Sequence, residues 1–189
     1  MVLKNRTVLV FLFVEIASGV YSIALRFIPL LALGKGVEIS VFLRYTALFT
    51  VINCIGSLII AYSAKRADRK WVYLFDVGFD IVSICLFLVP NGKVWFLVGY
   101  CISLLKDMFS PISFGYLYDC IEHNEGEKNA PTVLGVLDSI SNIVSIFIPI
   151  LIGAFWNKYF NGILGISMVL LILAVTSGIL ILPVNNDAA

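Results

Sequence analysis

The sequence predicts an all-α polytopic membrane protein with six transmembrane helices, and three observations carry that prediction. Of the 189 residues, 60% are hydrophobic and only 13% are charged, whereas a soluble domain has about 45–50% apolar and about 25% charged residues. The apolar residues gather in runs long enough for a helix to cross a hydrocarbon core of about 30 Å. Strands of a membrane barrel would instead alternate over segments of about 10 residues, so these continuous runs favour helices.

Six apolar runs follow one another along the chain, joined by short polar connections. We expect spans over residues 7–33, 41–64, 71–90, 94–118, 133–155 and 163–184, within one domain that covers residues 1–189. The first run is longer than the apolar region of a signal peptide, so we interpret it as a transmembrane helix. Pro111 predicts a kink in the fourth span, because proline lacks the N–H group that continues a helix.

Composition and motifs also exclude several functions. The 13 Lys and Arg residues nearly balance the 12 Asp and Glu residues, so the chain lacks the basic excess that a nucleic-acid partner requires. Its four cysteines form no CxxC pair and its single histidine, His123, falls in a polar loop, so we expect neither a metal site nor a cofactor. The sequence has no Gly-x-Ser-Gly motif of an intramembrane protease, and we expect no enzyme.

The distribution of Lys and Arg predicts the orientation in the membrane. With six spans, one side receives Lys4, Arg6, Lys65, Arg66, Arg69, Lys70 and Lys128, while the other receives only Lys35, Lys93 and Lys158. Cytoplasmic loops carry the excess of basic residues. We therefore expect a multi-pass protein of the cytoplasmic membrane with both termini in the cytoplasm.

Charged residues inside the predicted spans are the candidates for a functional site. A charge near the middle of a transmembrane helix costs roughly 2.5–3.5 kcal/mol on insertion scales, and such residues commonly mark substrate or ion pathways. We expect a substrate or proton pathway among Glu15, Arg26, Arg44, Asp76, Asp80, Lys106, Asp107 and Asp138. The alternative is that these groups pair within the bundle and hold its helices together.

Position within the spans separates these candidates. Arg26 and Arg44 lie toward the outer surface, where long side chains can extend to the interface, so a structural role is equally consistent with their positions. Asp76 and Asp80 are four residues apart, on one face of the third span. Two like charges on one face disfavour joint ionisation, and a carboxyl group that retains a proton is what a proton-coupled carrier needs.

The loop between the second and third spans, AYSAKRADRKWVY, begins at Ala61 and resembles the signature loop of the major facilitator superfamily, G-x-L-A-D-R-x-G-R-K. The matching residues are Ala64, Arg66, Arg69 and Lys70, whereas Ala61, Ser63, Lys65 and Asp68 replace the other signature residues. The fifth span has Gly135, Pro149 and Gly153 at the spacing of that family's exporter motif, and Lys106 stands where the family often keeps a membrane-embedded arginine. As a simpler reading, the loop's basic residues and Trp71 anchor the chain at the interface.

The resemblance implies a major-facilitator-like bundle that moves a small solute by alternating access, with Arg66, Asp68, Arg69 and Lys70 in an inner gating loop. Members of the family have two six-helix bundles, and these 189 residues supply one. We therefore expect the bilayer, a small-molecule substrate and a second six-helix bundle as partners, the simplest being a second copy of the chain. Two alternatives stay open: a substrate-binding membrane subunit of an ATP-driven transporter, and an accessory membrane subunit that does not transport.

Overall fold

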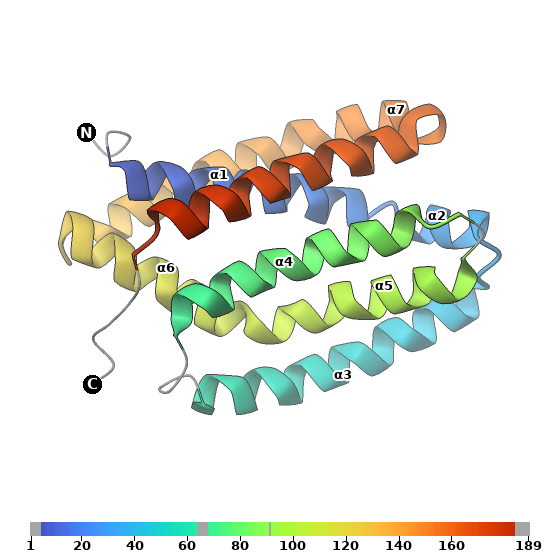
Figure 1. Cartoon of the computed structure of the whole chain (residues 1–189), viewed down its shortest axis with the longest axis horizontal. Helices are drawn as coiled ribbons and strands as arrows, with labels where there is room; N and C mark the ends of the chain where they lie inside the picture. Colours follow the sequence, from blue (N-terminus) through green and yellow to red (C-terminus); the bar gives the residue numbers. More distant parts are fainter. Residues whose placement is uncertain (1–4, 64–67, 91, 184–189) are drawn as a thin grey trace.

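The computed structural model describes residues 5–63, 68–90 and 92–183, apart from the side chains of residues 61, 63, 151 and 155–159. Over these residues the chain is helical and contains no strand (Figure 1). The elements are α1 (Arg6–Leu25), α2 (Ile28–Gly34), α3 (Ile39–Ser63), α4 (Arg69–Leu88), α5 (Lys93–Leu105), the 3-10 helix η3 (Lys106–Phe109), α6 (Ser110–Glu125) and α7 (Ala130–Ile181). The prediction of an all-α protein is confirmed.

Five helical stretches are long and apolar enough to cross a membrane: Arg6–Leu25, Ile39–Ile60, Arg69–Leu88, Ala130–Ala154 and Phe160–Ile181. Their outward faces are strongly apolar, since Leu58 on α3 is 74% exposed and Leu180 on α7 is 77% exposed. Water disfavours such surfaces, whereas lipid tails do not. The helices therefore indicate a membrane-embedded protein, although in the described residues five stretches, and not six, meet the length criterion.

Proline explains why the helix of the first predicted span ends early. The span predicted at 7–33 is divided, because α1 ends at Leu25 and the short helix α2 begins at Ile28. The ring of Pro29 would clash with the carbonyl group of Leu25, four residues earlier, and Pro29 has no N–H to bond to it. Gly36 then adopts φ of +73°, a conformation that glycine reaches without strain, where the chain turns toward α3.

The fourth predicted span, 94–118, is interrupted in the same way. α5 ends at Leu105, η3 occupies the next four residues, and α6 begins at Ser110, one residue before Pro111. Pro111 removes the hydrogen bond to the carbonyl group of Asp107 and so accounts for the tighter turn. α6 continues to Glu125, beyond the predicted end of this span, and stops where Gly126 adopts φ of +82°. The predicted kink is present, and no single helix crosses here.

α7 forms two arms of the bundle. Backbone hydrogen bonding assigns Ala130–Ile181 to one helical element, but Figure 1 shows this element reversing at one end of the bundle, so that its two arms lie side by side. Gly153 lies near Phe27 at the end of α1, whereas Gly178 lies against Leu74 near the start of α4. These contacts show that the two arms run in opposite directions.

Hydrogen bonds tie several chain segments together at the end of the bundle that holds both termini (Figure 1). Asn5 donates to the Glu125 carboxylate at 3.1 Å. The buried Lys70 Nζ donates to the carbonyl groups of Leu182 at 2.6 Å and Ile179 at 3.1 Å, at the end of α7. A cation is favourable at this helix end because the last carbonyl groups have no partner within the helix.

Replacing Lys70 with methionine tests this tie. We expect Lys70→Met to lower the free energy of unfolding by about 1.5–3 kcal/mol, the contribution of a hydrogen bond to a charged group. Thermal or denaturant unfolding of the purified protein in detergent measures the effect, with Lys128→Met, at an exposed lysine, as the control. Equal unfolding midpoints for the two variants would contradict a stabilising role for Lys70.

Candidate functional site

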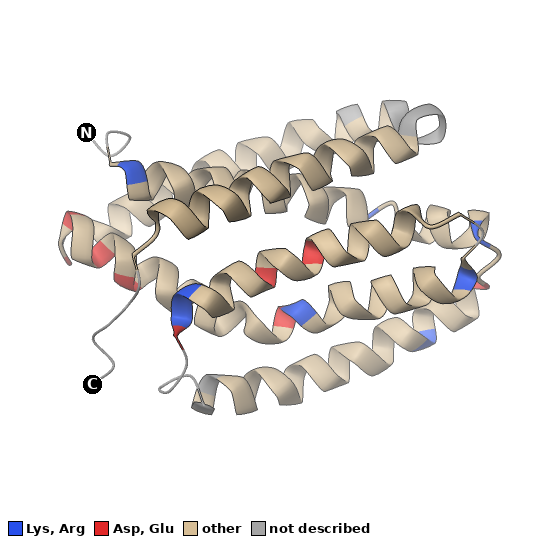
Figure 2. Cartoon of the chain, in the orientation of Figure 1, with Lys and Arg blue, Asp and Glu red and all other residues tan. Residues whose placement is uncertain are grey.

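A cavity of about 260 Å³ lies inside the bundle, with walls from α1, α4, η3, α6 and the first arm of α7. Five of the eight charged residues predicted for the pathway line it: Glu15, Asp76, Asp80, Lys106 and Asp107. Charges otherwise gather mainly at the two ends of the bundle (Figure 2). The structure thus brings together charged groups from three separate segments of the sequence.

Helical periodicity places the α1 and α4 residues at the cavity. Glu15, Ser18 and Ser22 follow one another at intervals of three and four residues, so that they share one face of α1. The opposite face, with the buried Ala17 and Ala24, packs into the apolar core. On α4 the same spacing aligns Tyr73, Asp76 and Asp80 along the cavity.

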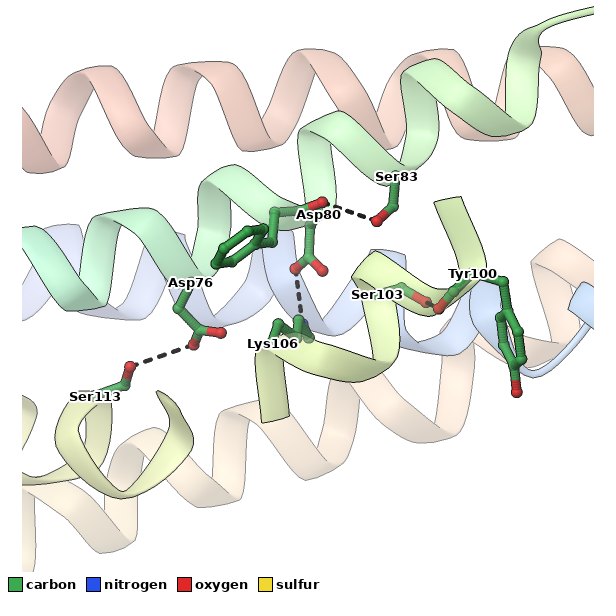
Figure 3. A network of polar contacts seen from close by, with 8 residues as sticks. Asp76, Asp80, Ser83, Tyr100, Ser103, Lys106 and Ser113 are labelled. Carbon is green, nitrogen blue, oxygen red and sulfur yellow. Dashed lines mark hydrogen bonds and ion pairs between the residues drawn. The ribbon is translucent and has the colours of Figure 1, made fainter. Parts of the chain in front are cut away.

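An ion pair between Lys106 and Asp80 forms the inner part of the cavity wall (Figure 3). The Lys106 Nζ lies 2.8 Å from Asp80 Oδ2, and the side chains are 17% and 1% exposed respectively. The same Nζ lies 5.8 Å from the centroid of the Tyr21 ring, within reach of a cation–π interaction. Lys106 is therefore held between a carboxylate of α4 and an aromatic ring of α1.

The other cavity carboxylates have weaker partners. Asp76 accepts a hydrogen bond from Ser113 Oγ at 3.3 Å (Figure 3). Within the described part of the chain, Glu15 and Asp107 form neither a side-chain hydrogen bond nor an ion pair. Asp107 is exposed, as are Ser22 and Phe114 on the cavity wall, so the cavity extends to the protein surface between α1 and the η3–α6 segment.

Two buried polar atoms at the cavity have no partner among the described residues. The hydroxyl group of Tyr73, a residue only 3% exposed, forms no hydrogen bond. Asp80 Oδ1 is also unpaired, although Oδ2 of the same carboxylate binds Lys106. Nearly all buried polar groups in proteins are hydrogen-bonded, and exceptions commonly have a functional reason. These two atoms therefore leave unused hydrogen-bonding capacity beside the cavity.

Three predicted pathway residues lie apart from this group. Arg26, Arg44 and Asp138 are exposed and do not line the cavity. Arg26 lies directly after the last residue of α1, and Arg44 lies in the second turn of α3, so both are near one end of the bundle. Asp138 is one turn from Ser141, the residue of α7 that reaches the cavity wall.

Comparison with known protein families, curated proteins and solved structures gives no match for this chain. The resemblance to the major facilitator superfamily therefore stays a prediction.

Of the predicted inner gating loop, Asp68, Arg69 and Lys70 lie at the end of the bundle where α1 begins and α7 ends. Arg66 falls outside the described residues. Asp68 caps α4 by accepting a hydrogen bond from the Lys70 N–H at 3.2 Å, and Arg69 forms an ion pair with Asp119 of α6. Together with the bonds from Lys70 to α7, these contacts join the start of α4 to the ends of α6 and α7.

Sequence reasoning missed the hydroxyl groups of the site. Tyr73, Ser113, Ser18 and Ser22 all line the cavity, but their residue types are common in transmembrane helices and draw no attention singly. Their spacing from the charged residues was an available signal, since Ser18 and Ser22 follow Glu15 on one helical face and Tyr73 precedes Asp76 by one turn.

In the described chain, no group of three or more His, Cys, Asp or Glu residues is arranged to hold a metal ion.

A double-mutant cycle tests the ion pair. Lys106→Met leaves the Asp80 carboxylate buried without its cation, and we expect this change to cost about 3–5 kcal/mol of stability. Adding Asp80→Leu removes that uncompensated charge, so the double variant should recover most of the loss. Unfolding in detergent measures the two single variants, Lys106→Met and Asp80→Leu, and the double variant. If the loss of unfolding free energy in the double variant equals the sum of the losses in the two single variants, the two residues do not interact directly.

Proposed function

We propose that the chain is a secondary carrier, a half-length major-facilitator-like bundle that moves a small solute across the cytoplasmic membrane by alternating access. The observation that supports this function is the cavity, where four carboxylates and one ammonium group meet between apolar helices. Asp80 lies about 16 Å along α4 from Arg69, by a rise of about 1.5 Å per residue. With Arg69 at the membrane surface, Asp80 would be halfway across a hydrocarbon core of about 30 Å. Charged groups are costly there and typically line substrate or ion pathways.

A six-span topology is part of this proposal, with α5, η3 and α6 together as one crossing. Helices broken at mid-membrane are common at transporter binding sites, and this break carries Lys106 and Asp107. The positive-inside rule then assigns the end of the bundle with both termini, Arg69 and Lys70 to the cytoplasm. The contacts of Arg69 and Lys70 would close that end of the pathway. They would break when the pathway opens to admit substrate from the cytoplasm.

The exposed side of the cavity supports a homodimer. Asp107 at the cavity mouth would face lipid in a single bundle, at a cost of roughly 2.5–3.5 kcal/mol on insertion scales. A second bundle over this side would enclose the cavity and remove the carboxylate from lipid. Two-fold symmetric pairs are the commonest assemblies, so a second copy is the simplest cover.

Transport by purified protein tests the carrier function. Compounds that raise the unfolding temperature are first identified in a solute library, and their flux is then measured in proteoliposomes without ATP, with and without a pH gradient. We expect flux that Asp107→Asn lowers at least tenfold, because this carboxylate lines the pathway, while the exposed Glu38→Gln at the bundle end leaves it unchanged.

Two results would contradict that expectation. If no stabilising compound crosses the vesicle membrane, the carrier function is wrong. If flux requires a co-purified ATPase, the chain is instead a substrate-binding subunit of an ATP-driven transporter.

Cysteine crosslinking tests the dimer. In a variant with the four native cysteines replaced by alanine, Ser22→Cys at the cavity mouth should form a disulfide-linked dimer in native membranes under mild oxidation. Leu173→Cys is the matched control, because it is 54% exposed on the arm of α7 that contributes no residue to the cavity wall. Equal crosslinking at both positions would contradict a dimer formed over the cavity.

A further inference from the structure

The cavity has a strongly unequal charge balance. Among the described residues that line it, the carboxylates are Glu15, Asp76, Asp80 and Asp107, and the only cation is Lys106. The whole chain, in contrast, is almost neutral, with a formal net charge of +1. The acidic excess is therefore a local property of the cavity, and it bears on which solutes the cavity can hold.

Lys106 is not available to pair with a ligand, because its ammonium group already forms an ion pair with Asp80. Its Nζ lies 2.8 Å from Asp80 Oδ2, and the Asp80 side chain is 1% exposed. Taking Lys106 away to bind an anion would leave a buried carboxylate without a counter-charge, which is strongly destabilising. The remaining three carboxylates, on α1, α4 and η3, have no ion pair within the described chain.

The Tyr73 side chain is an independent sign that the cavity receives a ligand. Its hydroxyl group is buried and has no hydrogen-bond partner in the described chain, and the residue forms part of the cavity wall. A phenol hydroxyl can accept a hydrogen bond from an ammonium group. Tyr73 lies one turn before Asp76 on α4, so aromatic and acidic groups occur together on this wall.

We propose that the cavity binds a small organic cation, an amine or a quaternary ammonium compound. Binding of the cation does not depend on the proposed carrier function. Only the idea that this cation is transported rests on that function. The volume of about 260 Å³ lies just below the range of roughly 300–1,000 Å³ for small-molecule pockets. The carboxylates come from α1, α4 and η3 and form no metal-binding group in the described residues, which favours an organic cation over a metal ion. An anion would meet three unpaired carboxylates, and the carboxylate of a zwitterion would have to compete for Lys106.

Direct binding to the purified full chain in detergent tests the charge preference. The probes are choline, its uncharged isostere 3,3-dimethyl-1-butanol, butylammonium and pentanoate, each titrated calorimetrically. We expect at least one of the two cations to bind at least tenfold more tightly than the uncharged isostere and pentanoate. Equal affinity for choline and its isostere, tighter binding of pentanoate, or no binding of either cation would overturn the inference.

Substitutions then locate the binding. Asp107→Asn removes one carboxylate at the exposed cavity mouth, and Glu15→Gln removes another from α1, so each should weaken binding of the better cation at least tenfold. Glu38→Gln, a carboxylate lost at the bundle end, should leave the affinity unchanged. Wild-type affinity in both cavity variants would overturn the inference. If one of the two variants fails to fold, the affinity of the other decides the test.

Failure of this inference can be distinguished from failure of the carrier function. If a cation binds with the expected variant effects but shows no flux in proteoliposomes, the inference is supported and the proposed carrier function is contradicted. Flux of an anion or a neutral solute by protein that binds neither cation retains the carrier function and overturns the inference.

Discussion

The ion pair between Lys106 and Asp80 determines how the rest of the site is arranged. It joins α4 to the point where α5 gives way to α6, and it places an almost fully buried carboxylate within reach of an ammonium group. Without this partner, Asp80 would be an uncompensated charge in an apolar bundle, which proteins rarely tolerate. Because Lys106 pairs with Asp80, the other carboxylates of the cavity have no ion-pair partner within the described chain.

The position of Lys106 in turn depends on the break between α5 and α6. Pro111 removes one helical hydrogen bond, and the backbone tightens into the 3-10 turn that carries Lys106 and Asp107. The sequence allowed this break to be predicted, because a proline inside an apolar run removes a hydrogen bond from the helix. The same reasoning applied to Pro29 would have predicted the end of α1 at Leu25, four residues earlier, but hydropathy alone extends the first span to residue 33.

Apolar run lengths and the high cost of a buried charge allowed the helical membrane fold and five of the cavity residues to be predicted from the sequence. Depth along a helix also indicated that Arg26 and Arg44 need not belong to the site, since both lie close to an end of the bundle. The partner of Lys106 could not be predicted, because four carboxylates lie at comparable depth. Which one it meets depends on how α4 rotates about its axis. Buried residues on the same side of α4 as Asp80, such as Val77 and Ile84, and exposed residues on the opposite side, such as Phe75 and Val82, set that rotation.

Helix α4 connects the cavity to the end of the bundle that holds both termini. Lys70, in its first turn, binds the last carbonyl groups of α7, and Tyr73, one turn later, lines the cavity. The Tyr73 ring packs against Phe11 and Tyr116 with centroids 5.4 and 5.7 Å apart, and Tyr116 donates a hydrogen bond to the carbonyl group of Pro183 at 2.6 Å. A packed aromatic layer therefore lies between the cavity and the hydrogen bonds at this end of the bundle. Because protein cores pack densely, a solute that displaced α4 would disturb the aromatic layer and the Lys70 bonds together. In the proposed carrier, α4 would link occupancy of the cavity to the contacts at that end of the bundle.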